Sequence, residues 1–213
     1  MNILLTGASG SLGKEFVKEF QKRNFNYYTQ TNSIDLGGKN ILCNFNDPKN
    51  LLSIKDYIKK NNITHLINNA GIYINGELNT LTDQSVVDLI NINLLSPILL
   101  SKYLYEHLAE TNQSGKIINI NSIAGKQPNY LESVYSASKH GLAGFGASLS
   151  INQKKSRIQI IDCFVGGIKS NMTKNRSNYD SLMQPSTISK FIVDLLQSKE
   201  DYTVSSIDLR NNV

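Results

Sequence analysis

The chain has 213 residues, of which 40% are hydrophobic and 18% charged, and its formal net charge is +5. This length is enough for one domain with a substantial core, and we expect residues 1–213 to form a single domain. The lysines are scattered and do not alternate with aromatic residues, which excludes an obvious nucleic-acid surface. No apolar run approaches the roughly 20 residues of a membrane span, and the first residues lack the basic and long apolar regions of a signal peptide, so we do not expect one. We therefore expect a cytoplasmic protein without a membrane segment.

The cysteines and histidines give no indication of a metal site. Cys43 and Cys163 are too few for a disulfide framework or a zinc site, and the three histidines lack metal-ligand spacing. We expect both cysteines to be buried in strands and no metal to be bound.

Short β-rich runs alternate with amphipathic helical segments along the chain. Leu12, Phe16 and Phe20 recur every four residues in a predicted helix over 12–23. Pro48 is expected to open a helix over 49–60, with Asp47 as its cap. The alternation predicts an α/β fold, a doubly wound parallel sheet with helices on both faces. The expected strands are 3–5, 27–30, 41–43, 65–68, 116–120, 158–164 and 203–209.

The segment Tyr135–Gln153 is predicted to be a helix although it contains Gly141, Gly144 and Gly146. Each glycine costs about 1 kcal/mol relative to alanine inside a helix. Close packing of the helix backbone against the sheet or a partner subunit would offset this cost. The alternative is a helix that is broken at the glycines.

The first strand is followed by a glycine-rich turn, Thr6-Gly7-Ala-Ser-Gly10-Ser-Leu-Gly13, which opens the first helix. Glycines let the backbone approach a pyrophosphate closely, and the helix N-terminus supplies amide donors and a favourable dipole. The turn therefore predicts a dinucleotide site, although an ordinary glycine loop is an alternative. The expected contacts are Gly7, Ser9, Gly10, Ser11, Leu12 and Gly13.

The sequence Tyr135-Ser-Ala-Ser-Lys139 lies thirteen residues after Ser122. Residues four apart lie on the same face of a helix, and a nearby ammonium lowers the pKa of a phenol. Tyr135 is therefore a candidate acid/base group near neutral pH. One such spacing is expected by chance in this chain, so its significance depends on the other motifs.

Taken together and in this order, the motifs resemble the short-chain dehydrogenase/reductase family over essentially the whole chain. The matching segments are Thr6-Gly7…Gly13, Asn68-Asn69-Ala70-Gly71, Asn93 within Ile92-Asn-Leu-Leu-Ser-Pro97, Ser122, and Tyr135…Lys139. The resemblance implies a Rossmann fold with a seven-stranded sheet of order 3-2-1-4-5-6-7. It also implies an NAD(P)(H)-dependent oxidoreductase that interconverts a carbonyl and a secondary alcohol.

The resemblance assigns roles to four residues. Tyr135 would be the general acid/base, and Lys139 would lower its pKa and bind the nicotinamide ribose. Ser122 would hold the substrate oxygen, and Asn93 would support a water that links Lys139 to solvent. Taken alone, Ser122 would be a structural residue at a strand end and Asn93 a local helix amide.

Further cofactor contacts follow from the resemblance. Tyr135 and Lys139 are among them, and Asn44 with Phe45 would lie against the adenine. Val165 stands where the family usually has proline, and Ser170 where it usually has threonine, so the hydroxyl is kept. The remaining expected contacts are Asn69, Ala70, Gly71, Gly166, Ile168 and Ser170.

The end of the second strand bears on the choice of cofactor. No acidic residue stands there to repel a 2′-phosphate, because Asp35 lies slightly further along the chain. Hydrogen bonds to a 2′-phosphate can be donated by Thr31, Asn32 and Ser33. We expect NADP(H) to be favoured over NAD(H), although no arginine is present.

Two other features depart from the family pattern. Ser11 replaces the usual middle glycine, a spacing commoner among sugar-nucleotide-modifying members. Only residues 171–184 separate the sixth strand from the last helix, which predicts a small lid.

Two alternatives to a carbonyl reductase are a non-catalytic dinucleotide sensor and a sugar-nucleotide-modifying enzyme. Sensors often lose the tyrosine or lysine that this chain keeps, and the chain has no room for a sizeable second domain. We expect a small-molecule carbonyl or alcohol as the substrate. Family members pair through long helices, so segments 89–107 and 135–153 predict a homodimer or homotetramer.

Overall fold

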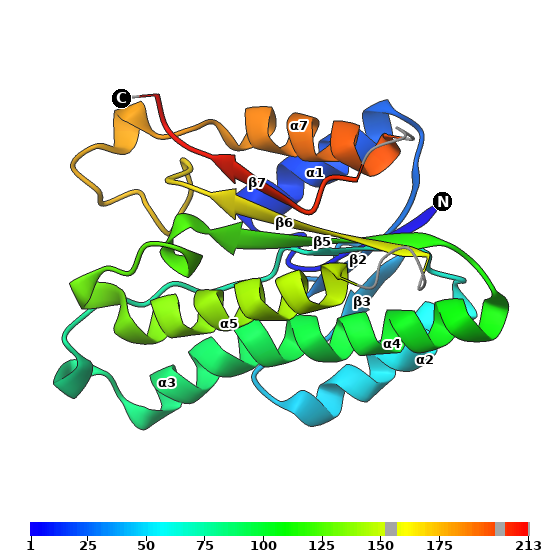
Figure 1. Cartoon of the computed structure of the whole chain (residues 1–213), viewed down its shortest axis with the longest axis horizontal. Helices are drawn as coiled ribbons and strands as arrows, with labels where there is room; N and C mark the ends of the chain where they lie inside the picture. Colours follow the sequence, from blue (N-terminus) through cyan, green and yellow to red (C-terminus); the bar gives the residue numbers. More distant parts are fainter. Residues whose placement is uncertain (152–156, 199–202, 213) are drawn as a thin grey trace.

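The computed structural model describes residues 1–151, 157–198 and 203–212. Within these ranges seven parallel strands form one sheet in the order β3-β2-β1-β4-β5-β6-β7, as Figure 1 shows. The predicted doubly wound α/β fold and its strand order are therefore confirmed. The strands are β1 (Asn2–Leu5), β2 (Asn26–Thr31), β3 (Asn40–Leu42), β4 (His65–Asn68), β5 (Gly115–Ser122), β6 (Ile158–Val165) and β7 (Ser206–Leu209).

Helices cover both faces of the sheet. One face carries α1 (Ser11–Lys22) and α7 (Pro185–Gln197). The other face carries α2 (Leu51–Lys60), α4 (Ser96–Thr111) and α5 (Ser133–Ser150) (Figure 1). The helix α3 (Asp83–Ile90) continues through a π-helical turn, Asn91–Leu95, into α4.

Neighbouring residues of the central strands point to opposite faces, as expected for β-strands. Leu66 and Ile117 belong to the core under α2 and α4, whereas Ile67 and Ile118 belong to the core under α1 and α7. All four side chains are fully buried. Strands buried on both sides explain the short, nearly continuous apolar runs in the sequence.

Most observed element boundaries differ from the expected ones by one to three residues, and two of these differences are at α2 and β7. Asp47 accepts a hydrogen bond from Lys49 N (2.9 Å), as predicted for a cap, but a 3₁₀ turn, Pro48–Asn50, precedes α2. The last strand begins at Ser206 instead of residue 203. Cys163 is buried in β6, as predicted, whereas Cys43 is buried but lies just after β3 instead of within it, and both thiols are free.

The glycines of α5 explain how this helix remains continuous. A Cβ atom at Gly141 would lie 2.8 Å from Cδ2 of Leu94, and one at Gly146 would lie 2.0 Å from Oδ2 of Asp162. At these two positions α5 approaches the π-helical turn before α4 and strand β6 too closely for a side chain. Gly144 is exposed and has no neighbour within 4 Å of such a Cβ. The predicted close packing thus holds for two of the three glycines, and residue 153 lies outside the described ranges.

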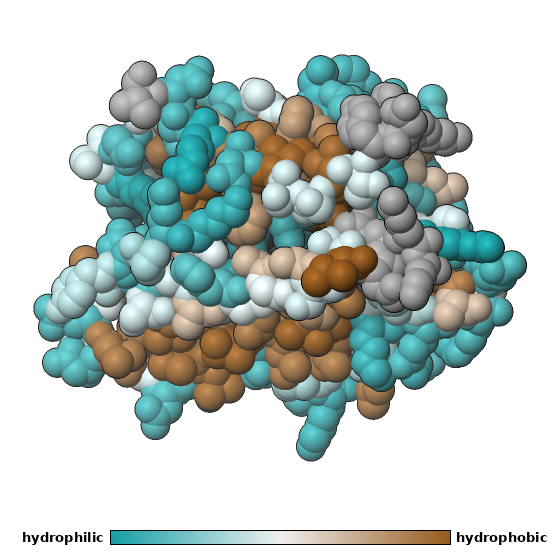
Figure 2. Space-filling model, viewed as in Figure 1, coloured by the Kyte–Doolittle hydropathy of each residue, from teal (hydrophilic) through white to brown (hydrophobic). Residues whose placement is uncertain are grey.

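One helical stretch is long and apolar enough to cross a membrane by length and composition alone. Asp83–Thr111 is continuous over 29 residues and contains an 18-residue window with a mean hydropathy of 1.3. These two measures are weak support for a membrane span, because the core helix of a soluble protein also passes them. The stretch lies along the sheet, where α4 packs on α2, β4 and β5. Figure 2 shows hydrophobic surface over the side of the molecule formed by α4 and α5.

Candidate active site

A cavity of about 880 Å³ opens at the carboxyl edge of the sheet. It is lined by the turn after β1 and by the loops after β2 to β6, because the ends of parallel strands meet at one edge. The predicted site residues in its lining are Gly7, Ser9, Gly10, Ser11, Leu12, Gly13, Asn32, Asn44, Phe45, Asn69, Ala70, Gly71, Ser122, Tyr135, Lys139, Gly166, Ile168 and Ser170.

The glycine turn forms a cradle that a side chain would fill. Gly7 has a φ of +65°, and a Cβ atom there would lie 2.7 Å from the Cα of Ala70. A Cβ at Gly13 would lie 2.3 Å from the oxygen of Gly7. Gly10 precedes α1 without a side-chain cap, and no acidic residue occupies the first turn. The amides at this helix N-terminus therefore fit the pyrophosphate of a dinucleotide.

Hydrogen bonds hold the glycine turn against the loop after β4. The Thr6 hydroxyl accepts from Asn69 N (3.0 Å) and Ala70 N (2.9 Å). The Asn69 side chain in turn donates to Thr6 O (2.9 Å) and Gly7 O (3.1 Å). The Asn69 side chain is thus a support for the turn as well as part of the cavity wall.

Gln30 also positions the glycine turn, and sequence reasoning did not find it. Its side-chain oxygen accepts from Gly7 N (3.0 Å), and its amide nitrogen donates to Cys43 O (2.7 Å). Gln30 therefore connects the turn after β1 to the end of β3. A glutamine within a strand gives no sequence signal for this role.

The end of β2 corrects part of the expected contact set for a 2′-phosphate. Thr31 is fully buried, and its hydroxyl donates to Ile34 O (2.5 Å), so it cannot face the cavity. Ser33 is exposed and is not part of the cavity lining. Of the three predicted residues only Asn32 lines the cavity. A strand alternates its faces, which is why Thr31 and Asn32 differ in this way.

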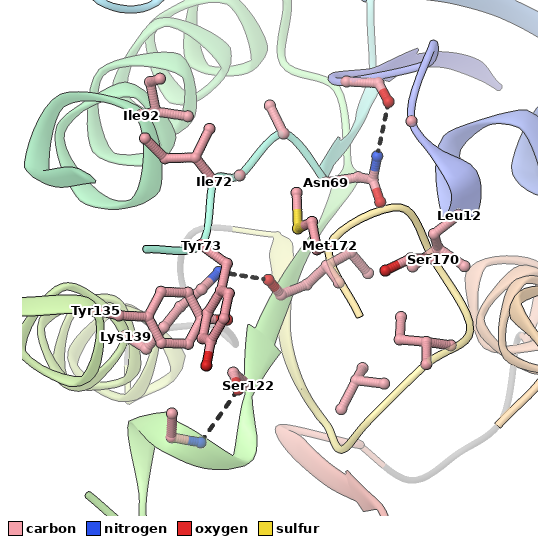
Figure 3. A pocket seen from close by; sticks show the side chains of 18 of the residues that line it. Leu12, Asn69, Ile72, Tyr73, Ile92, Ser122, Tyr135, Lys139, Ser170 and Met172 are labelled. Carbon is pink, nitrogen blue, oxygen red and sulfur yellow. Dashed lines mark hydrogen bonds between the residues drawn. The ribbon is translucent and has the colours of Figure 1, made fainter. Parts of the chain in front are cut away.

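Tyr135 and Ser122 come together from α5 and from the end of β5. Figure 3 shows Tyr135, Lys139 and Ser122 grouped on one side of the cavity, with Leu12, Asn69 and Ser170 on the other. Burial raises the pKa of Tyr135 above its ordinary value of 10.0, and a hydrogen bond with the Ser122 side chain opposes this rise. The Ser122 hydroxyl also accepts from Ala124 N (3.1 Å).

Lys139 lies beside Tyr135 but its ammonium is bonded elsewhere. It is only 6% exposed, its ammonium donates to Ile120 O (3.1 Å), and burial lowers its own pKa to about 8. The nitrogen lies 5.9 Å from the centroid of the Tyr135 ring. Burial is the largest influence on the phenol and raises its pKa, so the lowering of that pKa by Lys139 stays a prediction.

Asn93 lies behind the cavity wall and is not part of its lining. It is fully buried in the π-helical turn between α3 and α4. Its side chain accepts from Ile72 N and donates to Ile72 O, both at 2.9 Å, and donates to Ser138 Oγ at 3.3 Å. Asn93 therefore fixes the backbone next to Gly71, where an added Cβ would lie 3.9 Å from Lys139 Nζ.

Three residues on the substrate side of the cavity were not predicted. The Tyr73 hydroxyl donates to Glu132 Oε1 (2.8 Å), and the Tyr73 ring stands edge-on to Tyr135. The guanidinium carbon of Arg176 lies 5.4 Å from the centroid of the Tyr73 ring. These residues come from three separate loops, so no local pattern in the sequence could bring them together. The loop that carries Arg176 contains one short 3₁₀ turn, Tyr179–Ser181, in agreement with the predicted small lid.

The uncapped N-terminus of α1 shares one cavity with Ser122, Tyr135 and Lys139, on a parallel sheet of strand order 3-2-1-4-5-6-7. These features define a nucleotide-dependent oxidoreductase of the doubly wound class. Residues 1–180 match the family described as short chain dehydrogenase. The chain belongs to the short-chain dehydrogenase/reductase family. Its chemistry is NAD(P)-dependent oxidoreduction between C=O and CH–OH groups.

Two relatives with described activities are similar in sequence. Carbonyl reductase family member 4 of Xenopus laevis is 33% identical over 160 residues, which are 75% of this chain and 64% of the relative. The 3-oxoacyl-(acyl-carrier-protein) reductase FabG of Buchnera aphidicola subsp. Schizaphis graminum is 30% identical over 184 residues, 81% of this chain and 75% of the relative. The match thus spans about two thirds to three quarters of the relatives' length.

Solved structures agree with the fold. A 4-hydroxyisoleucine dehydrogenase complexed with NADH superposes with a TM-score of 0.88 at 21% identity, covering 99% of this chain and 97% of that one. ElxO with NADP bound gives a TM-score of 0.84 at 22% identity, covering 97% and 96%. One of these proteins holds NADH and the other NADP, so the fold accommodates both cofactors.

Proposed function

We propose that this chain interconverts a carbonyl and a secondary alcohol with Tyr135 as the general acid/base. The observation that carries the proposal is that Tyr135 and Ser122 share one cavity with the bare amides of α1. Burial raises the pKa of the phenol and the Ser122 side chain opposes this rise, so Tyr135 carries a proton at neutral pH that it can give to the substrate oxygen in reduction. A bound nicotinamide supplies or accepts the hydride.

Each residue of the group has a part in this proposal. Tyr135 gives its proton to the developing alkoxide in reduction and removes the hydroxyl proton in oxidation. Ser122 donates to the substrate oxygen and so holds the reacting carbon in position. The Lys139 ammonium is held by its hydrogen bond to Ile120 O, and its remaining N–H groups would bind the ribose of the cofactor. Asn93 acts through the backbone of Ile72, which it holds at both its N–H and its C=O.

We infer that NADP(H) is favoured over NAD(H). Asn32 lines the cavity at the end of β2 and can donate a hydrogen bond to a 2′-phosphate. Asp35 is the nearest acidic residue in sequence, and its carboxylate accepts from Gly37 N (2.8 Å) outside the lining. No carboxylate of the described residues therefore lines this end of the cavity to bind a 2′-hydroxyl or repel a phosphate.

We also infer a cytoplasmic homo-oligomer that forms through α4 and α5, with residues 1–213 as one domain. The hydrophobic surface over these helices in Figure 2 supports the interface. Gly144 on α5 is open, so a partner helix could approach its backbone closely.

The substitution Tyr135→Phe tests the proposed function. It removes the transferable proton and keeps the ring, so turnover of a carbonyl panel should fall by at least 1,000-fold while the Kd for NADPH changes little. Tyr57→Phe, which removes a hydroxyl outside the cavity lining, is the matched control. Near-normal turnover by Tyr135→Phe on any substrate of the wild type would overturn the assignment.

A further inference from the structure

Three charged side chains line the described part of the cavity, and Arg176 is the one that neither the proposed chemistry nor a hydrogen bond to a carboxylate or carbonyl of the described residues uses. Lys139 is buried and bonded to Ile120 O, and Glu132 accepts from Tyr73. The Arg176 side chain is 38% exposed, and its nearest carboxylate oxygen, Oε1 of Glu132, lies 4.0 Å from Nη2. This distance is too long for a hydrogen bond. Apart from its contact with Tyr73, where a hydrogen bond to the hydroxyl opposes the rise in the pKa of that phenol, the guanidinium makes no hydrogen bond to the described residues, so most of its five N–H donors are free.

Arg176 lies close to the reaction centre. Its guanidinium carbon is 5.4 Å from the centroid of the Tyr73 ring, and that ring is 5.0 Å from the ring of Tyr135. The cation is therefore separated from the proposed acid/base group by a single aromatic ring. Contact with the ring face also favours a guanidinium at this place.

The backbone around Arg176 is fixed. Arg176 N donates to Thr173 O (3.0 Å), and Tyr179 N donates to Arg176 O (3.1 Å). The Thr173 hydroxyl donates to Ile168 O (2.6 Å), which joins this turn to the loop after β6. The Cα of Arg176 is therefore held in position before a ligand arrives, and only the side chain loses freedom on binding.

We propose that Arg176 binds a carboxylate of the substrate, so that the substrates are oxo acids and the corresponding hydroxy acids. The inference deepens the proposed function and rests on it. In reduction the carbonyl carbon gains a hydride from NAD(P)H, the oxygen gains the Tyr135 proton, and the carboxylate is unchanged on Arg176. The planar guanidinium matches the two oxygens of a carboxylate.

Glu132 limits the positive charge that an anion meets beside Arg176. Its carboxylate lies 4.0 Å from the guanidinium, so the two charges partly cancel. The Tyr73 hydroxyl bonded to Glu132 offsets part of the negative charge, which leaves a small positive excess on the guanidinium. This excess is too small to offset the desolvation of a second negative charge, so the surroundings favour a carboxylate over a dianionic phosphate.

The test compares acids with neutral partners of the same shape. Reduction of 3-oxobutanoate, 4-oxopentanoate and 5-oxohexanoate is measured beside that of their methyl esters, and the three lengths report how far Arg176 lies from the reacting carbon. The wild type should prefer at least one acid over its ester by roughly 10- to 100-fold in kcat/KM. Arg176→Gln should bring this ratio close to one, mainly through KM, and Arg176→Lys should give an intermediate ratio.

Lys174→Gln is the matched control, because it removes a positive charge from the same loop at an exposed position outside the cavity lining. It should keep the acid preference. Circular dichroism establishes that each variant is folded. Calorimetry with 4-oxopentanoate and oxidised cofactor should show a Kd that rises roughly tenfold or more in Arg176→Gln.

The outcomes separate this inference from the proposed function. Turnover of acids and esters with equal efficiency by the wild type overturns the inference and leaves the function intact. Equal losses for acid and ester in Arg176→Gln also overturn it, because they indicate that Arg176 only holds the loop in place. No turnover of any acid, ester or other carbonyl by the wild type overturns both.

Discussion

The ring of Tyr73 stands edge-on to the ring of Tyr135, with the ring centroids 5.0 Å apart and the planes at 85°. The positive edge of one ring meets the negative face of the other in such a pair. The Tyr73 hydroxyl is itself held by Glu132 at 2.8 Å. Tyr73 therefore restricts the orientation of Tyr135 from the substrate side, while Ser122 approaches it from the end of β5.

Substitution of Tyr73 tests this positioning role. An edge-to-face pair contributes about 0.5–1.5 kcal/mol, so Tyr73→Leu should lower kcat roughly 2- to 12-fold. Tyr73→Phe keeps the ring contact, loses only the Glu132 hydrogen bond, and should lower kcat less. Steady-state kinetics of both variants with one substrate provide the measurement. A kcat for Tyr73→Leu equal to that of the wild type would contradict the role.

The pair of Tyr135 and Lys139 marks where sequence reasoning succeeded and where it stopped. The spacing placed both residues on one face of α5 and in one cavity with Ser122. It could not show that the Lys139 ammonium donates to Ile120 O, because that carbonyl lies nineteen residues earlier in the sequence, on strand β5. The direction of a pKa shift depends on burial, which the motif does not contain.

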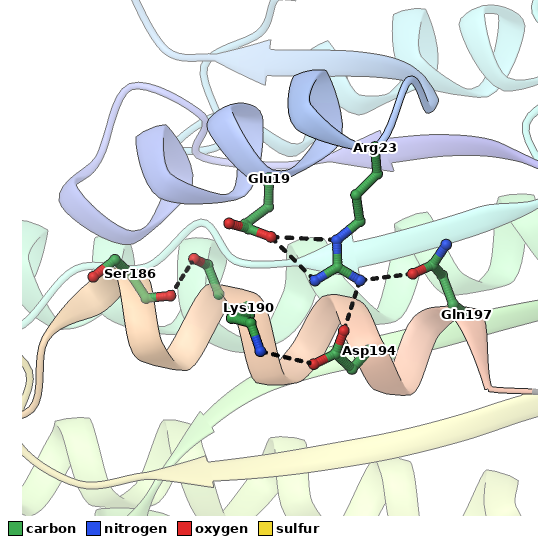
Figure 4. Close-up of polar contacts among 7 residues, drawn as sticks. Glu19, Arg23, Ser186, Lys190, Asp194 and Gln197 are labelled. Carbon is green, nitrogen blue, oxygen red and sulfur yellow. Dashed lines mark hydrogen bonds and ion pairs between the residues drawn. The ribbon is translucent and has the colours of Figure 1, made fainter.

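The same limit holds for contacts between distant segments. Arg23 on α1 pairs with Glu19 one turn earlier, with Asp194 of α7 at 2.6 Å, and with Gln197 at 2.6 Å (Figure 4). The helices were predictable from their periodicity, but a contact across 171 residues of sequence was not. Arg176 escaped prediction for the same reason, whereas the place of the glycine turn between β1 and α1, which is local, was predicted, although its support by Gln30 was not.

Lys139 should make the chain less stable at neutral pH than a neutral side chain would. Burial lowers its pKa from 10.5 to about 8, so the native state holds an unfavourable buried charge below pH 8. Between pH 8 and 10.5 the native state releases the proton first, and the free energy of unfolding should rise with pH. Lys139→Met removes this buried charge, which should raise the free energy of unfolding at pH 7 by at most about 3 kcal/mol. It also removes the hydrogen bond to Ile120 O, which should lower the free energy of unfolding by roughly 1 kcal/mol.

Urea unfolding of both proteins from pH 7 to pH 10 measures this effect. The stability difference between variant and wild type should shrink as the pH rises through 8, while the variant stays catalytically poor. A difference that does not depend on pH would mean that Lys139 carries no buried charge in the native state.

Asn32→Asp should change the cofactor preference. A carboxylate at this position of the cavity wall would repel a 2′-phosphate and accept a hydrogen bond from a 2′-hydroxyl. We expect the Kd for NADPH to rise roughly tenfold or more, with a smaller change or a fall for NADH. Ser33→Asp, which adds the same charge outside the lining, should have less effect. Fluorescence titration with both cofactors measures these Kd values. Equal changes in Kd for the two variants would mean that the 2′ position of the cofactor ribose does not lie beside Asn32.

The glycines of α5 allow a comparison within one helix. At Gly146 an added methyl group would lie 2.0 Å from Oδ2 of Asp162, whose Oδ1 accepts from Asn119 at 2.9 Å. Asp162 is buried and cannot move without weakening that hydrogen bond, so Gly146→Ala should lower the free energy of unfolding by roughly 1–3 kcal/mol. Gly144 has open space, so Gly144→Ala should raise it by up to about 1 kcal/mol through helix propensity alone. Thermal unfolding should show a lower melting temperature for Gly146→Ala and a higher one for Gly144→Ala. A lower melting temperature for both variants would mean that a partner helix packs on Gly144.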